Sequence, residues 1–113
     1  MEKYILITGG TKGIGRAVAD ILAQSGYKLI LTYGSDEVQA ATVKAEFQEL
    51  YPASVEVLQA DISEKQAIDT IENYLNTHDI HLFSVVFNAG LTCRTPLEQM
   101  TLEEWERVFF AHV

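Results

Sequence analysis

A glycine-rich turn near the start of the chain constrains its fold more than any other feature. The apolar run of residues 4–8 leads directly into Gly9, and four glycines fall within the seven residues 9–15. A continuous apolar run bounded by glycines is typical of a strand buried on both faces. The helix predicted to follow points its free amides at the turn, and glycines let a diphosphate approach the backbone. The turn therefore predicts a diphosphate site between a strand and a helix.

The same alternation of strand and helix continues along the chain. Further apolar strands are predicted at residues 29–33, 55–59 and 82–87, and the segments between them have helical periodicity. The apolar helix positions are Ile14, Ala17, Val18, Ile21 and Leu22, then Ala40, Val43, Phe47 and Leu50, then Ile68, Ile71 and Leu75. Four strands alternating with helices predict an α/β fold with a parallel sheet.

Two capping-box patterns mark later helix starts. Ser63 stands three residues before Gln66, which predicts that the Ser63 hydroxyl caps the third helix. Thr101 stands three residues before Glu104 and opens a last predicted helix, with Leu102, Trp105 and Phe109 on one side.

Parallel strands joined by crossover helices bring the loops after each strand to one edge of the sheet, where ligands bind. These loops are residues 9–15, 33–36, 59–63 and 87–94. The first loop is not a nucleoside triphosphate P-loop, because Gly15 is followed by Arg16 and Ala17 and not by Lys and Ser or Thr. A turn that merely joins strand and helix is the alternative to a diphosphate site.

The glycine spacing is TGxxxGxG from Thr8 to Gly15, and this pattern resembles the amino-terminal half of short-chain dehydrogenases/reductases. Asp61 with Ile62 after the third strand resembles the family's adenine-binding aspartate. Residues 88–90 (Asn, Ala, Gly) resemble the end of its NNAG motif, and Trp105 and Val108 fall where its fourth helix carries them. The resemblance implies a Rossmann-type doubly wound parallel sheet, of which residues 1–113 form the dinucleotide-binding, amino-terminal half.

The loops and the resemblance together give one set of candidate cofactor-binding residues. These are Gly9, Thr11, Lys12, Gly13, Ile14, Gly15, Tyr33, Ser35, Asp61, Ile62, Asn88, Ala89 and Gly90. Two alternatives stay open: Asp61 caps the turn into the third helix, and residues 88–90 form an ordinary turn that ends a strand.

The end of the second strand bears on the choice between NAD(H) and NADP(H). An acid there would bind the adenosine 2′-hydroxyl and repel a 2′-phosphate, but this position is Tyr33. Lys12 lies where NADP-preferring members of the family carry a basic residue, and Thr11 and Ser35 add hydroxyl groups. We therefore predict NADP(H) as the cofactor, although Asp36 or Glu37 could turn back toward the ribose and Lys12 could be an ordinary solvated lysine.

The catalytic groups that the resemblance implies are not found in this sequence. The family uses a serine and a YxxxK pair from its second half, and none of the five tyrosines here is followed by lysine four residues later. His112 stands at the position of the family's active-site asparagine. It either substitutes for that asparagine in function or is a surface or packing histidine. Phe87 replaces the first asparagine of NNAG. Cys93 and Arg94 lie in a loop with which members of the family often contact the substrate. Nothing near Cys93 in the sequence activates its thiol.

Two functions follow as hypotheses. The first is the cofactor-binding portion of an NADP-dependent oxidoreductase, most like 3-oxoacyl-[acyl-carrier-protein] reductases of fatty acid biosynthesis, with a small-molecule or carrier-bound carbonyl substrate. This chain alone would then be inactive, either as a segment of a roughly doubled chain or as a half that must associate to be stable, and we expect a homo-oligomer. The second is a catalytically silent NADP(H)-binding or interaction module.

Charge and cysteine content limit the remaining possibilities. The formal net charge of −8 argues against nucleic acids and anionic membranes as partners. The apolar run at the start of the chain is too short for a signal peptide or a transmembrane helix. A single cysteine, Cys93, forms neither an intrachain disulfide nor a cysteine zinc site, so we expect a cytoplasmic protein without a metal centre.

Overall fold

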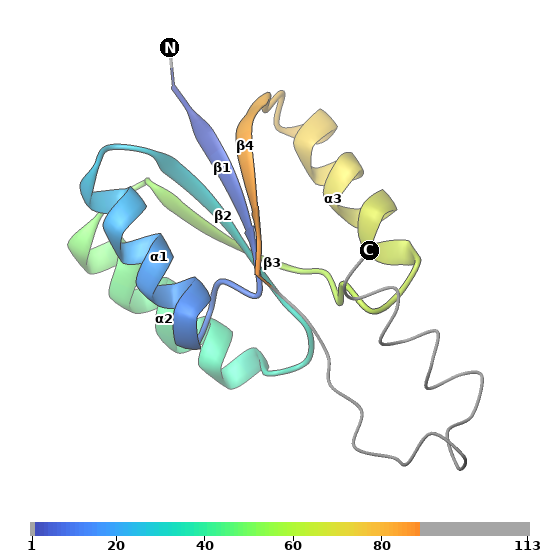
Figure 1. Cartoon of the computed structure of the whole chain (residues 1–113), viewed down its shortest axis with the longest axis horizontal. Helices are drawn as coiled ribbons and strands as arrows, with labels where there is room; N and C mark the ends of the chain where they lie inside the picture. Colours follow the sequence, from blue (N-terminus) through green and yellow to red (C-terminus); the bar gives the residue numbers. More distant parts are fainter. Residues whose placement is uncertain (1, 89–113) are drawn as a thin grey trace.

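The computed structural model describes residues 2–88, and the expectations for Ala89, Gly90, Cys93, Arg94, His112 and the helix after Thr101 lie outside them. The elements in chain order are β1 (Tyr4–Thr8), α1 (Gly13–Gln24), β2 (Lys28–Tyr33), α2 (Glu37–Leu50), β3 (Val55–Gln59), α3 (Gln66–Thr77) and β4 (Leu82–Phe87). Figure 1 shows the strands side by side, with α1 and α2 on one side of them and α3 on the other. The predicted strands agree with the structure, except that β2 begins one residue earlier, at Lys28.

The four strands form one parallel sheet in the order β3-β2-β1-β4. The chain moves outward from β1 through β2 to β3, then returns to place β4 on the other side of β1. This reversal makes the carboxyl ends of β1 and β4 a topological switch point, where open α/β sheets bind their ligands. The parallel α/β architecture predicted from the sequence is confirmed.

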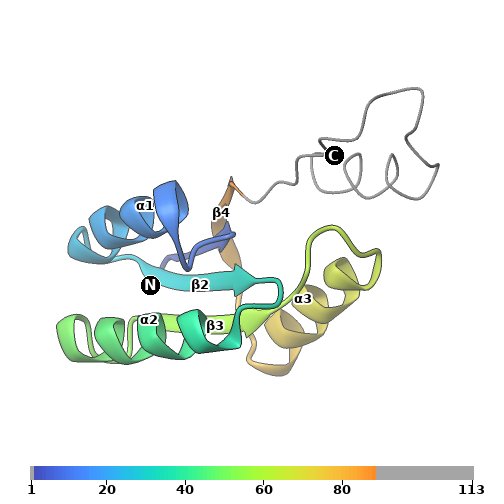
Figure 2. The same cartoon turned by 90° about the horizontal axis from the view of Figure 1, so that it is seen from below.

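Side chains alternate between the two faces of the sheet, and helices cover both. Ile5 and Ile7 of β1 belong to a core cluster with Leu29 and Leu31 of β2 and with Phe47 of α2. Leu6 and Thr8, on the opposite face, border an apolar groove of about 290 Å³ beneath α3. In Figures 1 and 2, α3 accordingly lies apart from α1 and α2. The sheet is therefore doubly wound.

The buried side of α1 agrees only in part with the one that its apolar residues predict, because Val18 and Leu22 pack against the core but two other predicted residues do not. Ile14 and Ile21 are 76% and 63% exposed, whereas Gly15, Ala19 and Ala23 are buried. The buried residues recur every four positions and have small or no side chains, which lets the helix backbone lie close to the sheet. Close approach of these small residues, together with the packing of Val18 and Leu22, decides which side of α1 is buried.

The start of α3 also differs from the prediction. The helix begins at Gln66 with Lys65 at its N-cap, and no side chain caps it. The Ser63 hydroxyl instead donates a hydrogen bond to Oδ1 of Asp61, at 2.6 Å. The prediction of a capping box at Ser63 and Gln66 is therefore wrong, because the Ser63 hydroxyl is hydrogen-bonded to the side chain of Asp61 and not to the helix.

Within the described residues, none of the helices combines the length and the apolar character needed to cross a membrane.

Candidate nucleotide-binding cleft

A cleft of about 450 Å³ opens at the carboxyl edge of the sheet. All four loops named from the sequence contribute to it. Its lining residues are Gly9, Thr11, Lys12, Thr32, Tyr33, Gly34, Ser35, Asp36, Ala60, Asp61, Ile62 and Asn88. The parallel topology thus brings segments separated by up to 79 residues to one site.

Hydrogen bonds from neighbouring strands fix the turn after β1. The hydroxyl of the buried Thr32 accepts a hydrogen bond from the amide of Gly9, and its carbonyl accepts one from the amide of Gly10, both at 3.2 Å. On the other side, the side-chain amide of Asn88 donates to the carbonyl of Gly9, at 3.2 Å. The backbone amide of Asn88 donates to the Thr8 hydroxyl, at 2.9 Å. The ends of β1, β2 and β4 are therefore joined around the glycine turn.

Two glycines meet different requirements in this turn. Gly13, the first residue of α1, has φ of +62°, a left-handed conformation that favours glycine. A Cβ atom on Gly15 would overlap the carbonyl oxygen of Gly9 and would lie 2.6 Å from Nδ2 of Asn88. The absence of this atom allows the first turn of α1 to pack directly against the loop.

The amino terminus of α1 is open, in contrast to that of α2. No side chain caps α1 at Lys12, and its first turn contains no acidic residue. In α2, Asp36 accepts a hydrogen bond from the amide of Gln39, and Glu37 lies in the first turn. The first amides of a helix have no partner within the helix, and the helix dipole makes this end positive. Of these two helices, α1 is therefore the one whose amino-terminal amides are free to bind an anion.

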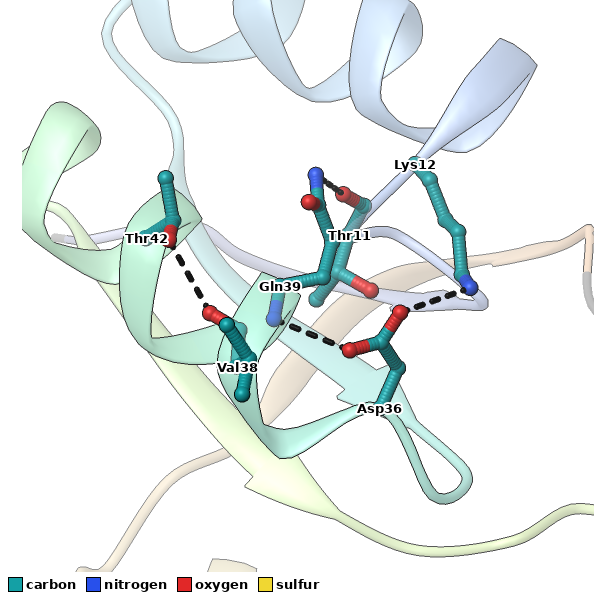
Figure 3. Close-up of polar contacts among 6 residues, drawn as sticks. All are labelled: Thr11, Lys12, Asp36, Val38, Gln39 and Thr42. Carbon is teal, nitrogen blue, oxygen red and sulfur yellow. Dashed lines mark hydrogen bonds and ion pairs between the residues drawn. The ribbon is translucent and has the colours of Figure 1, made fainter.

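Lys12 and Asp36 form an ion pair on the rim of the cleft, with Nζ and Oδ2 separated by 3.2 Å (Figure 3). Oδ1 of the same carboxylate accepts the hydrogen bond from the Gln39 amide, at 3.0 Å. The Gln39 amide and, after it, Lys12 hold the pKa of Asp36 below its ordinary value of 3.8. The side chain of Gln39 also donates to the carbonyl of Thr11, at 3.4 Å. The glycine turn is therefore tied to the start of α2 at two points.

Asp61 is oriented by the turn that follows β3. Its Oδ1 accepts hydrogen bonds from the backbone amide of Ser63, at 3.0 Å, and from the Ser63 hydroxyl, at 2.6 Å. The carboxyl group also lies near Gly34, because a Cβ atom added to Gly34 would be 3.7 Å from the carboxyl carbon of Asp61. Asp61 thus stabilises a turn and lines the cleft at the same time.

The structure brings eight of the predicted cofactor-binding residues into the lining of the cleft: Gly9, Thr11, Lys12, Tyr33, Ser35, Asp61, Ile62 and Asn88. Gly13, Ile14 and Gly15 instead form the first turn of α1 beside it. Ala89, Gly90 and His112 lie outside the described residues.

Thr32, Gly34, Asp36 and Ala60 line the cleft but were absent from the predicted set. A polar residue within the apolar run of residues 29–33 was the available signal for Thr32. Across residues 2–88, no group of three or more His, Cys, Asp or Glu side chains is placed to hold a metal ion.

The sheet order, the two-sided helix packing and the cleft at the switch point define a Rossmann-like α/β protein. The chain belongs to the short-chain dehydrogenase family, whose model matches residues 3–112.

Two relatives illustrate this membership. The chain is 37% identical over 109 residues to the 3-oxoacyl-[acyl-carrier-protein] reductase FabG of Aggregatibacter actinomycetemcomitans, covering 96% of this chain and 44% of the relative. It is 31% identical to the 3beta-hydroxysteroid dehydrogenase 1 of Eggerthella lenta, covering 94% and 40%. The chain therefore spans less than half the length of these curated relatives.

Solved structures agree with the fold. A short-chain dehydrogenase from Sphingobium yanoikuyae in complex with NADPH superposes with a TM-score of 0.82 at 29% identity, over 96% of this chain and 42% of that one.

Proposed function

We propose that this chain is the dinucleotide-binding portion of an NADP(H)-dependent oxidoreductase that transfers hydride between its cofactor and a carbonyl or alcohol. The resemblance to FabG supports a 3-oxoacyl-carrier-protein reductase-like activity in the whole protein. A small-molecule or carrier-bound carbonyl substrate, a cytoplasmic location and homo-oligomeric assembly are parts of the same proposal.

The observation that carries the proposal is the combination of an uncapped α1 with the close packing of Gly15 on Gly9. Unblocked amides at a helix start suit a diphosphate. The missing Cβ at position 15 lets the first turn of α1 pack directly against Gly9, which keeps the start of the helix beside the glycine turn. The residues present therefore fit a dinucleotide, with the diphosphate at residues 13–15 and the adenine near Asp61 and Ile62. The bound nicotinamide would supply hydride to a carbonyl or accept it from an alcohol.

The 2′-phosphate of NADP(H) would bind at Lys12 and Ser35. Both residues line the cleft beside Tyr33, which stands where an acid would favour NAD(H). Asp36, three residues further along the chain, uses its two carboxylate oxygens for the Gln39 amide and Lys12. This engagement weakens the case for Asp36 as a ribose ligand and supports NADP(H).

Comparative titration of NADPH and NADH tests the cofactor. We expect tighter binding of NADPH, and we expect Lys12→Ala to weaken NADPH without changing NADH. Lys44→Ala is the matched control, because Lys44 is an exposed lysine on α2 that does not line the cleft. Equal affinities in the wild type, or unchanged NADPH affinity in Lys12→Ala, would contradict the assignment.

We further propose that turnover requires a YxxxK pair, which these 113 residues do not contain, together with a serine from the second half of the family's chain. An assay of NADPH oxidation with a 3-oxoacyl thioester on this chain should give binding without turnover. The same result is expected of a silent NADP(H)-binding module, so the assay tests only the need for the missing groups. Measurable turnover would overturn that part of the proposal.

A further inference from the structure

We propose that Gln39 is a positioning residue of the diphosphate site, because its side-chain amide fixes the peptide from which α1 starts. This inference rests on the proposed function, in which the first amides of α1 bind a diphosphate. Gln39 lies on α2 and does not line the cleft, so it acts through the glycine turn and not by touching the ligand.

The side chain of Gln39 makes a different contact from the one that its place in α2 favours. Gln39 stands three residues after the N-cap residue Asp36, which is the spacing of a capping box. Its backbone amide donates to the Asp36 side chain at 3.0 Å, as that motif requires. In a complete capping box, the side chain would turn back to the backbone of the N-cap residue. The side chain of Gln39 instead extends to the glycine turn, where Nε2 donates to the carbonyl of Thr11, 28 residues earlier, at 3.4 Å (Figure 3).

This contact fixes a peptide plane at the amino end of α1. The carbonyl of Thr11 and the amide of Lys12 belong to one planar peptide unit and point in opposite directions. Because Gln39 holds the carbonyl toward α2, the Lys12 amide is turned away from α2. Lys12 is the N-cap residue of α1, with φ of −153° and ψ of 164°, and the unpaired amides of the helix follow directly. The orientation of this plane therefore sets where the first amides of α1 lie.

The backbone at Gly13 explains why the turn needs an anchor. Gly13 follows Lys12 with φ of +62°, and a glycine permits many backbone conformations. A turn with this freedom loses conformational entropy when it binds an anion, whereas an anchored turn is already ordered. The bond from the half-buried Gln39 to the buried Thr11 joins neutral groups. Salt should therefore not weaken this anchor, in contrast to the exposed ion pair of Lys12 and Asp36.

The test uses two ligands that differ only in the diphosphate, ADP and adenosine, with affinities measured by NMR titration. Gln39→Met removes the donor while keeping the length of the side chain and adding no charge. Gln39→Glu also removes the donor, but glutamate is favoured in the first turn of a helix, so α2 should remain stable. In both variants, the backbone amide at position 39 still donates to Asp36. Gln48→Met and Gln48→Glu are the matched controls, because Gln48 is an exposed glutamine of the same helix that does not line the cleft.

We expect Gln39→Met to weaken ADP binding roughly twofold to fivefold, the scale of one neutral hydrogen bond, and Gln39→Glu to weaken it at least as much. Adenosine binding should be unchanged, as should the binding of both ligands to the Gln48 variants. The loss in Gln39→Met should be the same at low and at high salt. Hydrogen exchange at the Gly13 amide should be faster in both Gln39 variants, which a loss of stability elsewhere in α2 would not produce.

Far-ultraviolet circular dichroism and chemical denaturation check that each variant is folded. Folded Gln39 variants that bind ADP as tightly as the wild type, or that lose ADP and adenosine by the same factor, would overturn the inference while leaving the proposed function intact. A wild-type chain that binds ADP no more tightly than adenosine would overturn both, because the first amides of α1 would then hold no diphosphate.

Discussion

The carbonyl oxygen of Gly9 occupies the space where a Cβ atom on Gly15 would lie. Gly9 is held there from two sides, because its amide donates to Thr32 on β2 and its carbonyl accepts from Asn88 after β4. The loop therefore cannot move away from α1 without losing contacts to both neighbouring strands. This relationship makes the first turn of α1 a rigid part of the cleft.

Gly15→Ala should destabilise the fold by about 2 kcal/mol or more, because the new methyl group overlaps backbone and the loop has no room to retreat. Nucleotide binding should fall with it. Chemical denaturation and NADPH titration measure the two effects. Gly34→Ala is the control, because a Cβ there meets only ordinary contacts beside Asp61. Equal stability of the two variants would contradict the packing argument.

Thr32→Val should cost about 1–2 kcal/mol, because it keeps the shape of a buried side chain but leaves the amide of Gly9 without its acceptor. The measurement is the free energy of unfolding, with hydrogen exchange at Gly9 as a local readout. Thr42→Val on α2 is the control, because Thr42 is exposed and its hydroxyl donates only to the carbonyl of Val38 within the same helix (Figure 3). Faster exchange at Gly9 in Thr42→Val than in Thr32→Val would contradict the prediction.

The sequence was sufficient to predict the strands and the parallel α/β architecture, because buried parallel strands appear as uninterrupted apolar runs. It was also sufficient to place most of the cleft, since the topology brings the loops after parallel strands to one edge. The buried side of α1 was predictable from hydrophobicity only in part, at Val18 and Leu22 but not at Ile14 and Ile21. Gly15, Ala19 and Ala23 are buried because they permit close approach, and that requirement is visible only once the helix lies on the sheet.

The choice of polar partners was the other limit. The sequence suggested that Ser63 caps α3, but Asp61 is closer to the Ser63 hydroxyl and accepts its hydrogen bond. Likewise, nothing local indicates that Lys12 and Asp36, 24 residues apart, form an ion pair. The Lys12–Asp36 pair forms because the glycine turn packs against the start of α2.

Lys12→Met should raise the pKa of Asp36 toward its ordinary value of 3.8 without reaching it, because the Gln39 amide remains and is the larger cause of the lowered pKa. A carboxyl group whose pKa is lower in the folded state adds stability above its unfolded pKa, and this stability is lost as the pH falls through the folded value. The wild type should therefore lose the Asp36 contribution below pH 3.8. Carbon NMR titration of the Asp36 carboxyl group measures both pKa values. A pKa that does not move in Lys12→Met would show that the ion pair is not formed in solution.

Ser63→Ala should weaken NADPH and NADH by the same factor, about twofold to fivefold, because it removes one of the two donors that orient Asp61 toward the cleft. The loss falls on the adenine part of the site, which both cofactors share. Asp61→Ala should have a larger effect of the same kind, since it removes the carboxylate itself. Ser25→Ala is the control, because the hydroxyl of Ser25 donates to a carbonyl of α1 away from the cleft. The ratio of NADPH to NADH affinity separates this effect from that of Lys12, where only NADPH should respond. A change in that ratio in Ser63→Ala would place Asp61 near the 2′-phosphate and not at the adenine.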